Sequence, residues 1–145
     1  MTLKISELDY NSISSRSGAR DAVLLLVHGR GGNKRLLEFY SKRFDIPDLN
    51  YICLQAPIAE QREDQVARNE SGWSWYLSPG YKGIEDSRKK IFNVCEQLQA
   101  QGIRAEKIFW LGFSQGGAMG LDLFLRYPQR LGGVFCISGL LPQYK

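Results

Sequence analysis

Ser114 lies at the centre of a G-x-S-x-G motif, Gly112–Gly116, the pattern of a serine that attacks a carbonyl carbon. Glycines two positions before and after the serine permit a sharp strand-to-helix turn that exposes the hydroxyl. The flanks fit, because the apolar run Ile108–Leu111 precedes the motif and an apolar helical pattern follows it as far as Pro128. Taken alone, the motif is a weak signal that occurs by chance, and the alternative is an ordinary glycine-rich strand-to-helix turn. With both flanks, the sequence predicts that Ser114 is a nucleophile and that the N–H of Gln115, at the helix start, binds an oxyanion.

A second glycine-rich segment, His28–Gly32, directly follows the apolar run Ala22–Val27. Glycines here let the backbone approach a substrate carbonyl closely, so the N–H of Arg30 would join that of Gln115 around the developing negative charge. A plain glycine-rich loop is an equal alternative for this segment by itself. His28 is the only histidine. It fits a role in ordering the loop or lining the substrate pocket better than a role as general base.

The elements that must position these residues alternate between strands and helices. This order predicts an α/β domain with a mostly parallel sheet and helices on both faces. Ligands bind at the carboxyl ends of such strands, so Ser114 and the His28–Gly32 loop should share one rim of the sheet. We expect a marginal edge strand from Leu3, Ile5 and Leu8; strands over 22–27, 51–55, 108–111 and 133–138; a helix of Leu36, Leu37, Tyr40 and Phe44 capped by Asn33; and a helix of Ile84, Ile91, Cys95 and Leu98 that stops at Gly102.

Residues 57–83 form a long connection that is rich in charge, glycine and aromatic side chains. Connections longer than about 12–15 residues are uncommon in compact domains and are often functional. Trp73, Trp75 and Tyr76 lie in this segment and would wall an apolar acyl pocket. Packing of the same side chains onto the core is an equal alternative.

Composition limits the other classes of function. With 145 residues, 43% hydrophobic and 23% charged, the chain fits one domain, residues 1–145. No window reaches the roughly 18 apolar residues of a membrane span, and the N-terminus lacks the core of a secretory signal. We therefore expect a cytoplasmic protein without a stable membrane anchor. The net charge is +4, but only Arg88–Lys90 forms a basic cluster, which favours a solvated helix face over nucleic-acid binding. Cys53, Cys95 and Cys136 are widely spaced in apolar segments and fit free buried thiols rather than metal ligands.

The sequence resembles the phospholipase/carboxylesterase family of α/β-hydrolases, which includes the acyl-protein thioesterases. The matching segments are V-H-G-R-G-G-N, W-S-W-Y, E-K-I-F-W-L-G-F-S-Q-G-G-A-M and R-Y-P-Q-R-L-G-G-V-F-C-I-S-G-L-L-P, and the resemblance covers residues 22–142. It implies that Ser114 is the nucleophile and that Arg30 and Gln115 supply oxyanion amides. It also implies hydrolysis of small carboxylic esters or thioesters through an acyl-enzyme, without metal or organic cofactor.

The sequence departs from the family after Ser114. The catalytic order in this fold is serine, then an acid, then histidine. Residues 115–145 contain one carboxylate, Asp122, and no histidine. Asp122 lies two turns along the helix that begins after Ser114, so we interpret it as structural or solvated. The sequence therefore resembles an N-terminal portion, and we expect the isolated chain to be inactive.

Two non-catalytic alternatives remain open for the isolated chain. It could bind acyl ligands without turning them over, or it could complete its sheet with another chain. Gly133–Ser138 is apolar, uncharged and free of proline, so as an edge strand it would favour self-association.

Overall fold

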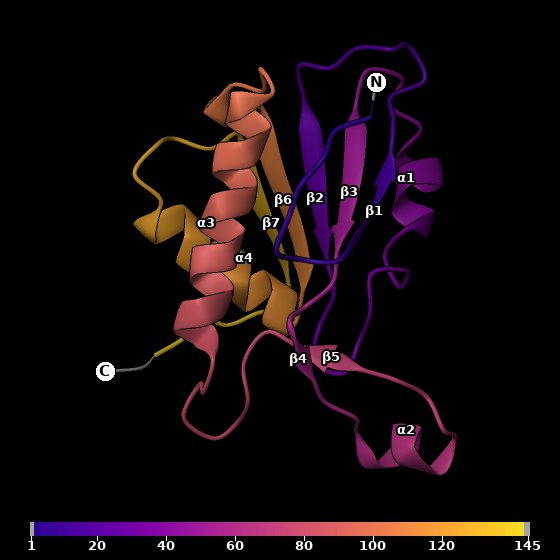
Figure 1. The fold of residues 1–145 in the computed structure, drawn as a ribbon, viewed down its shortest axis with the longest axis vertical. Coiled ribbons are helices and arrows are strands. Elements are labelled where there is room, and N and C mark those ends of the chain that lie inside the picture. Colours follow the sequence, from indigo (N-terminus) through magenta and orange to yellow (C-terminus); the bar gives the residue numbers. More distant parts are fainter. Residues whose placement is uncertain (1, 144–145) are drawn as a thin grey trace.

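The structure is a computed structural model that describes residues 2–143 (Figure 1). Its main sheet has five strands in the order β1-β3-β2-β6-β7, all parallel except β1, which pairs antiparallel with β3. This confirms the expected α/β fold. In chain order the elements are β1 (Tyr10–Ile13), β2 (Val23–Val27), α1 (Phe39–Phe44), β3 (Asn50–Leu54), β4 (Ile58–Ala59), α2 (Glu63–Ala67), β5 (Trp73–Ser74), α3 (Ile84–Ala100), β6 (Ile108–Phe113), α4 (Gln115–Arg126) and β7 (Gly133–Ile137), with one 3-10 turn at Ala105–Lys107.

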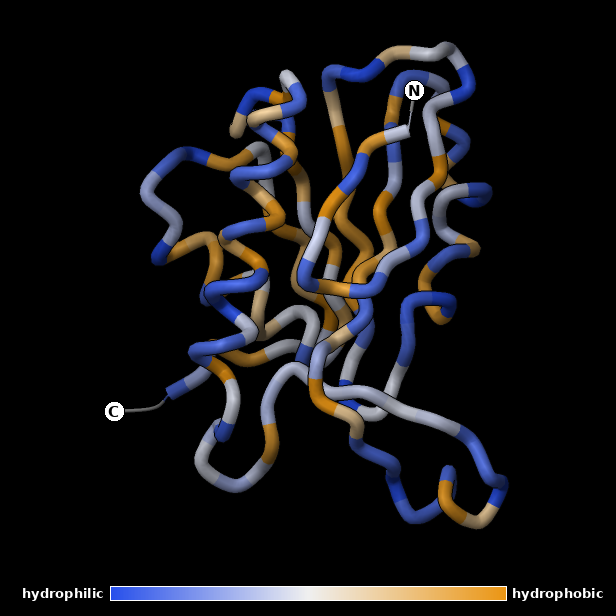
Figure 2. The backbone as a smooth tube through the Cα atoms, in the orientation of Figure 1, coloured by the Kyte–Doolittle hydropathy of each residue, from blue (hydrophilic) through white to orange (hydrophobic). Residues whose placement is uncertain are grey.

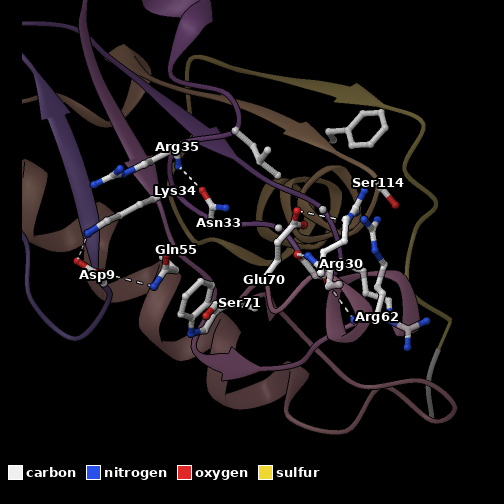
Figure 3. A pocket seen from close by; sticks show the side chains of 18 residues that line it. Asp9, Arg30, Asn33, Lys34, Arg35, Gln55, Arg62, Glu70, Ser71 and Ser114 are labelled. Atoms are coloured by element: carbon white, nitrogen blue, oxygen red, sulfur yellow. Dashed lines mark hydrogen bonds and ion pairs between the residues drawn. The ribbon is translucent and has the colours of Figure 1, made fainter.

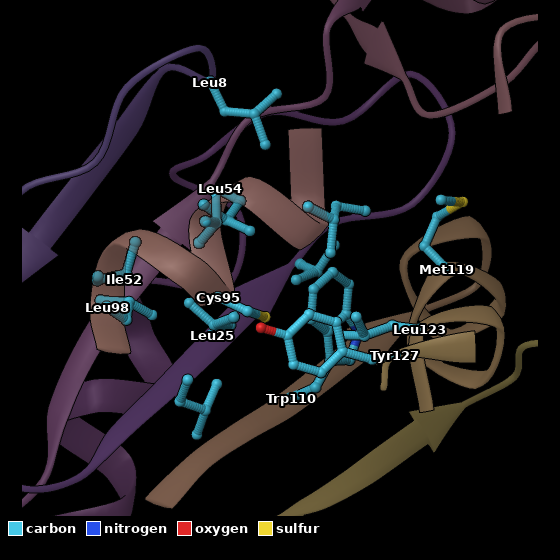
Figure 4. Packing of buried hydrophobic residues seen from close by; sticks show 14 of the residues in the cluster. Leu8, Leu25, Ile52, Leu54, Cys95, Leu98, Trp110, Met119, Leu123 and Tyr127 are labelled. Carbon is cyan, nitrogen blue, oxygen red and sulfur yellow. The ribbon is translucent and has the colours of Figure 1, made fainter. Parts of the chain in front are cut away.

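Side chains that alternate along the central strands divide the core into two layers. One face of the sheet, which includes Leu25, Ile52 and Trp110, packs against α3 and α4 (Figure 4). The other face, which includes Leu24 and Tyr51, packs against Tyr40 of α1 and its neighbours. The helices therefore cover both faces, and every residue of β2 and β3 is buried, as their continuous apolar runs predict.

Two elements near the N-terminus differ from expectation. Leu3 and Leu8 are buried but lie outside any strand, and the edge strand is β1, whose residues are half-buried. Helix α1 begins only at Phe39, five residues later than expected. The Asn33 side chain still accepts a hydrogen bond from the N–H of Arg35 at 2.9 Å, so it caps a turn rather than the helix. Leu36, expected on the buried face, is 53% exposed.

The connection 57–83 is more ordered than the sequence predicted. β4 and β5 pair antiparallel and enclose α2, and we refer to residues 58–74 as the β4–α2–β5 lobe. The lobe lies below the carboxyl ends of the central strands in Figure 1, and its α2 end is largely hydrophilic in Figure 2. It is therefore placed beside the rim where ligands bind in parallel sheets.

The strand β7 ends the sheet among residues 2–143. Its Phe135 and Ile137 side chains are 56% and 38% exposed. Phe135 pairs with Leu111 and therefore lies on the α1 face of the sheet, and Figure 1 shows α1 at the opposite edge from β7. Within the described residues, no helix has the length and apolarity that crossing a membrane requires.

Candidate active site

Ser114 has the strained backbone that the motif predicts. It joins β6 to α4 with φ 53° and ψ −116°, a region that residues other than glycine rarely adopt. A Cβ on Gly112 would overlap the Gly116 carbonyl, and a Cβ on Gly116 would overlap the Val27 carbonyl. The two glycines are therefore required by the close approach of helix, turn and neighbouring strand, and Ser114 is left half-exposed at the carboxyl end of β6.

The His28–Gly32 loop lies against this turn, as expected for two segments that follow neighbouring strands. A Cβ on Gly29 would stand 3.1 Å from the Ser114 Cβ. The Gly29 carbonyl accepts hydrogen bonds from the His28 ring at 2.7 Å and from the Gly32 N–H at 3.1 Å. In a trans peptide the N–H points opposite to the carbonyl, so the Arg30 N–H is directed away from the His28 ring.

Both ring nitrogens of His28 are occupied. Nε2 accepts a hydrogen bond from the Ala56 N–H at 3.0 Å, so the proton resides on Nδ1 and is donated to the Gly29 carbonyl. The ring is 1% exposed, and its burial lowers the pKa of His28 to about 4, against the opposing effect of the bond to Gly29. His28 is thus a neutral side chain that orients the loop, and this geometry is incompatible with a general base for Ser114.

The aromatic segment of residues 73–76 has more than one role. Trp75 is 0% exposed and donates its indole N–H to the His28 carbonyl at 2.9 Å. The expected pocket role is therefore wrong for Trp75 and His28, because their side chains belong to the core. Trp73 and Tyr76 do line pockets. The Gln115 side chain binds this segment, since it accepts from the Trp75 N–H and donates to the Tyr76 carbonyl, each at 2.9 Å.

Ser114 lies between two pockets. The larger, of about 1000 Å³, extends over the His28–Gly32 loop and the α2 end of the lobe, and Figure 3 shows Arg30, Arg62 and Glu70 around it with Ser114 at its edge. The smaller, of about 450 Å³, has a mixed lining in which Tyr76 and Leu140 lie beside polar side chains such as Ser138. A scissile bond at Ser114 would therefore have space on both sides.

The loop is also held by side chains that the sequence did not reveal. Gln65 of α2 and Ser74 of β5 hydrogen-bond the backbone of Gly31, from 34 and 43 residues away. No local pattern marks either residue, since both follow from how the lobe folds back. A glycine-rich loop needs hydrogen-bond partners from other segments to hold its backbone. This need was the one sequence signal that such residues must exist, although it did not identify them.

Asp122 has a structural role. It is 2% exposed and accepts from Arg88 Nε at 2.7 Å and Arg126 Nε at 2.9 Å. Asp122 is therefore a structural residue rather than a solvated one. Arg88, which was expected on a solvated helix face, instead pairs with this buried carboxylate. Cys53 and Cys95 are free and buried as expected, whereas Cys136 is only half-buried.

Comparisons with known proteins agree with this geometry. Acyl-protein thioesterase 1 of Eremothecium gossypii is 28% identical over an alignment 142 residues long, which covers 92% of this chain and 60% of that protein. Carboxylesterase SOBER1 of Arabidopsis thaliana is 41% identical over an alignment 129 residues long, which covers 82% of this chain and 57% of that protein. The crystal structure of esterase PE8 superposes with a TM-score of 0.76 at 26% identity and covers 93% of this chain and 65% of the esterase.

The chain thus spans less than two thirds of each of these relatives. The sequence model of the phospholipase/carboxylesterase family matches residues 8–145, nearly the whole chain. This match agrees with the mostly parallel sheet and with the strained strand-to-helix turn at Ser114, which we call the elbow. The chain belongs to the phospholipase/carboxylesterase family.

Proposed function

We propose that this chain provides the nucleophile and the oxyanion site of a hydrolase that cleaves carboxylic esters or thioesters. The observation that carries the proposal is the backbone of Ser114. Strained conformations persist mainly where function requires them, and this one presents a hydroxyl at a pocket edge. Names of relatives, an acyl-protein thioesterase and a carboxylesterase, support the same class of substrate.

In the proposed reaction the Ser114 oxygen attacks the carbonyl carbon and the π electrons move onto the carbonyl oxygen. The N–H groups of Arg30 and Gln115 donate to that oxyanion. Collapse of the tetrahedral intermediate breaks the bond to the leaving oxygen or sulfur, which takes up the proton that the Ser114 hydroxyl gave up on attack and departs as alcohol or thiol. The ester left on Ser114 is then hydrolysed by water, which releases the carboxylic acid and restores the hydroxyl. The groups on either side of the scissile bond occupy the two pockets, with Trp73 in the wall of the larger and Tyr76 in the wall of the smaller.

We propose that neither His28 nor Asp122 is the general base for Ser114. His28, the sole histidine, uses both ring nitrogens, and Asp122 is held by two arginines. A serine hydroxyl without a base is a poor nucleophile, and loss of one member of a catalytic triad can lower kcat by about 10⁶. We propose that the isolated chain therefore forms and hydrolyses acyl-enzyme only very slowly.

Turnover of p-nitrophenyl acetate tests this proposal. We expect the purified chain to hydrolyse the ester barely above the buffer rate, with little change in Ser114→Ala. Robust turnover that His28→Ala abolishes would contradict the proposal and make His28 the base. Strong binding of an acyl ligand, with no labelling of Ser114 by a fluorophosphonate probe, would favour a binding module instead.

A second candidate, self-association through β7, is favoured by the exposed side chains of that edge. The Ile137 carbonyl faces β6, because it accepts from the Ser114 N–H at 2.8 Å. Backbone groups of a strand alternate between its two sides, so those of Val134 and Cys136 face outward. An antiparallel pair of two copies centred on Phe135 would join these groups and stack the two Phe135 side chains.

Size-exclusion chromatography tests the second candidate. We expect the wild type to elute as a dimer or larger species at high concentration and Phe135→Lys to elute as a monomer. Phe124→Lys is the matched control, because Phe124 is similarly exposed, at 52%, but lies on α4. A wild type that stays monomeric at every concentration would contradict self-association.

A further inference from the structure

The β4–α2–β5 lobe contacts three consecutive residues of the His28–Gly32 loop: Arg30, Gly31 and Gly32. The Arg30 guanidinium donates to Glu60 from Nε at 3.0 Å and from Nη2 at 2.6 Å. The Gly31 N–H donates to Ser74 Oγ at 3.1 Å. The Gly32 carbonyl accepts from the Trp73 N–H at 2.9 Å. The partner in each contact is a residue of the lobe: Glu60, Ser74 or Trp73. The position of the lobe therefore sets the position of the loop.

Gln65 adds a fourth, buried contact from a side chain on α2. It is 6% exposed, and its Nε2 donates to the Gly31 carbonyl. Its Oε1 accepts from the Arg62 N–H at 2.8 Å. The amide can satisfy both partners in one orientation only, because one is an acceptor and the other a donor. The side chain therefore links the first turn of α2 to the loop with a defined direction.

Space around Gly31 strengthens this link. Gly31 has φ 69°, and a Cβ at this position would stand 2.9 Å from Gln65 Oε1. The loop thus has no side chain of its own at this point, and Gln65 fills the space beside it. With Gly31 held at its N–H by Ser74 and at its carbonyl by Gln65, the peptides on both sides of this residue are fixed.

We propose that Gln65 is a positioning residue for the Arg30 amide of the oxyanion site. The inference rests on the proposed function of Ser114 and Arg30. Gln65 acts through Gly31, adjacent to Arg30 in the chain, and does not touch the reacting atoms. Because Arg62, Gln65 and Arg68 also line the larger pocket, the lobe joins the pocket wall to the oxyanion site.

The test is an isosteric pair of variants. Gln65→Glu keeps the acceptor for Arg62 but replaces the donor with an oxygen that repels the Gly31 carbonyl. Gln61→Glu is the matched control, because Gln61 lies in the same lobe and its amide donates only to the Glu70 carbonyl. Both variants change the charge of the lobe equally. Ser74→Ala, which removes the acceptor of the Gly31 N–H, is the second variant should Gln65→Glu fail to fold.

Two readouts separate positioning from general stability. The first is the rate at which p-nitrophenyl acetate acetylates Ser114, and the second is deuterium exchange of the 28–32 amides, each compared with the melting temperature. Loss of a whole oxyanion donor costs about 10²–10³ in rate, so a displaced donor in Gln65→Glu should slow acetylation about ten-fold. We expect faster exchange in 28–32 with a melting temperature like that of Gln61→Glu.

Each outcome decides one claim. Equal acetylation and equal exchange in Gln65→Glu and Gln61→Glu would overturn the inference while leaving the function of Ser114 intact. Acetylation in the wild type that Ser114→Ala does not remove would overturn the proposed function. In that case the exchange measurement still decides whether Gln65 positions the loop, because it needs no reaction at Ser114.

Discussion

Two turns that leave neighbouring strands, the elbow after β6 and the loop after β2, are fixed in opposite ways. The elbow, Gly112–Gly116, is held by its own backbone packing, in which glycines allow contacts that a Cβ would block. The loop, His28–Gly32, is held by side chains of the lobe, including Gln65 and Ser74, and by the ring of its own His28. One half of the candidate site is therefore fixed by local backbone packing, whereas the position of the other half depends on how the lobe docks.

The largest expected effect concerns the local half. Gly116→Ala forces a Cβ into the Val27 carbonyl, so the helix, turn or strand must move. We expect a loss of more than about 3 kcal/mol in the free energy of unfolding, or no soluble protein, since such overpacking is among the costliest changes. Gly133→Ala is the control, because its Cβ would meet only an ordinary contact at 3.7 Å. Similar stability of the two variants in urea titrations would show that the elbow does not need its glycines.

The next effect concerns the His28–Gly32 loop and depends on pH. His28 has a pKa of about 4 in the fold, below its usual 6.5, because of burial. The unfolded chain therefore binds more protons between these values, and stability falls as pH drops from 6.5 towards 4, by about 3 kcal/mol in total. We expect His28→Gln to be less stable than the wild type at pH 7. Its free energy of unfolding should no longer fall between pH 6.5 and 5, because the titrating ring is gone. Parallel slopes for both proteins in pH-dependent unfolding would contradict a neutral buried His28.

How far the sequence could predict the molecule follows from the same contrast. Ser114, its flanking glycines and the strands 22–27, 51–55 and 108–111 were predictable because apolar runs and glycine spacing are local signals. The contact of Gln65 with Gly31 was not, because it joins residues 34 positions apart. The pairing of β4 with β5 and the late start of α1 at Phe39 were also missed, and no apolar run or glycine spacing marks them. His28 was placed correctly in a loop-ordering role, but its burial was hidden because the sequence does not show that Trp75 packs beside it.

A smaller effect measures the strain at the elbow directly. Ser114 has a positive φ that glycine adopts freely and alanine does not. We expect Ser114→Gly to be more stable than Ser114→Ala by about 1 kcal/mol. The measurement is the unfolding midpoint of the two variants, and an equal or reversed order would indicate a relaxed turn.

The smallest effect concerns the exposed tether of the loop. The Arg30 side chain is 49% exposed, and its hydrogen bonds to Glu60 hold the pKa of that carboxyl below its usual value. Exposed ion pairs contribute about 0.2–1 kcal/mol, so Glu60→Gln should reduce stability by less than about 1 kcal/mol. Any contribution of the wild-type pair is present above pH 4.5 and fades as pH falls below it. If Glu60→Gln lost as much stability as His28→Gln, the Arg30–Glu60 pair would hold the loop as strongly as the buried His28 ring, which would contradict this ranking.

The most direct test of the central claim, that Ser114 is a nucleophile beside an oxyanion site, is a single acyl transfer rather than turnover. The chain is incubated with p-nitrophenyl acetate, and acetylation is located by peptide mass mapping. The site without its base keeps part of its rate advantage over water, about 10³–10⁴ in serine hydrolases, and lacks the base that would release the acyl group. We therefore predict slow acetylation that accumulates on Ser114, is absent in Ser114→Ala and persists in Ser138→Ala, a serine of the same smaller pocket. Acetylation spread over lysines and other serines, with no preference for Ser114, would contradict the account.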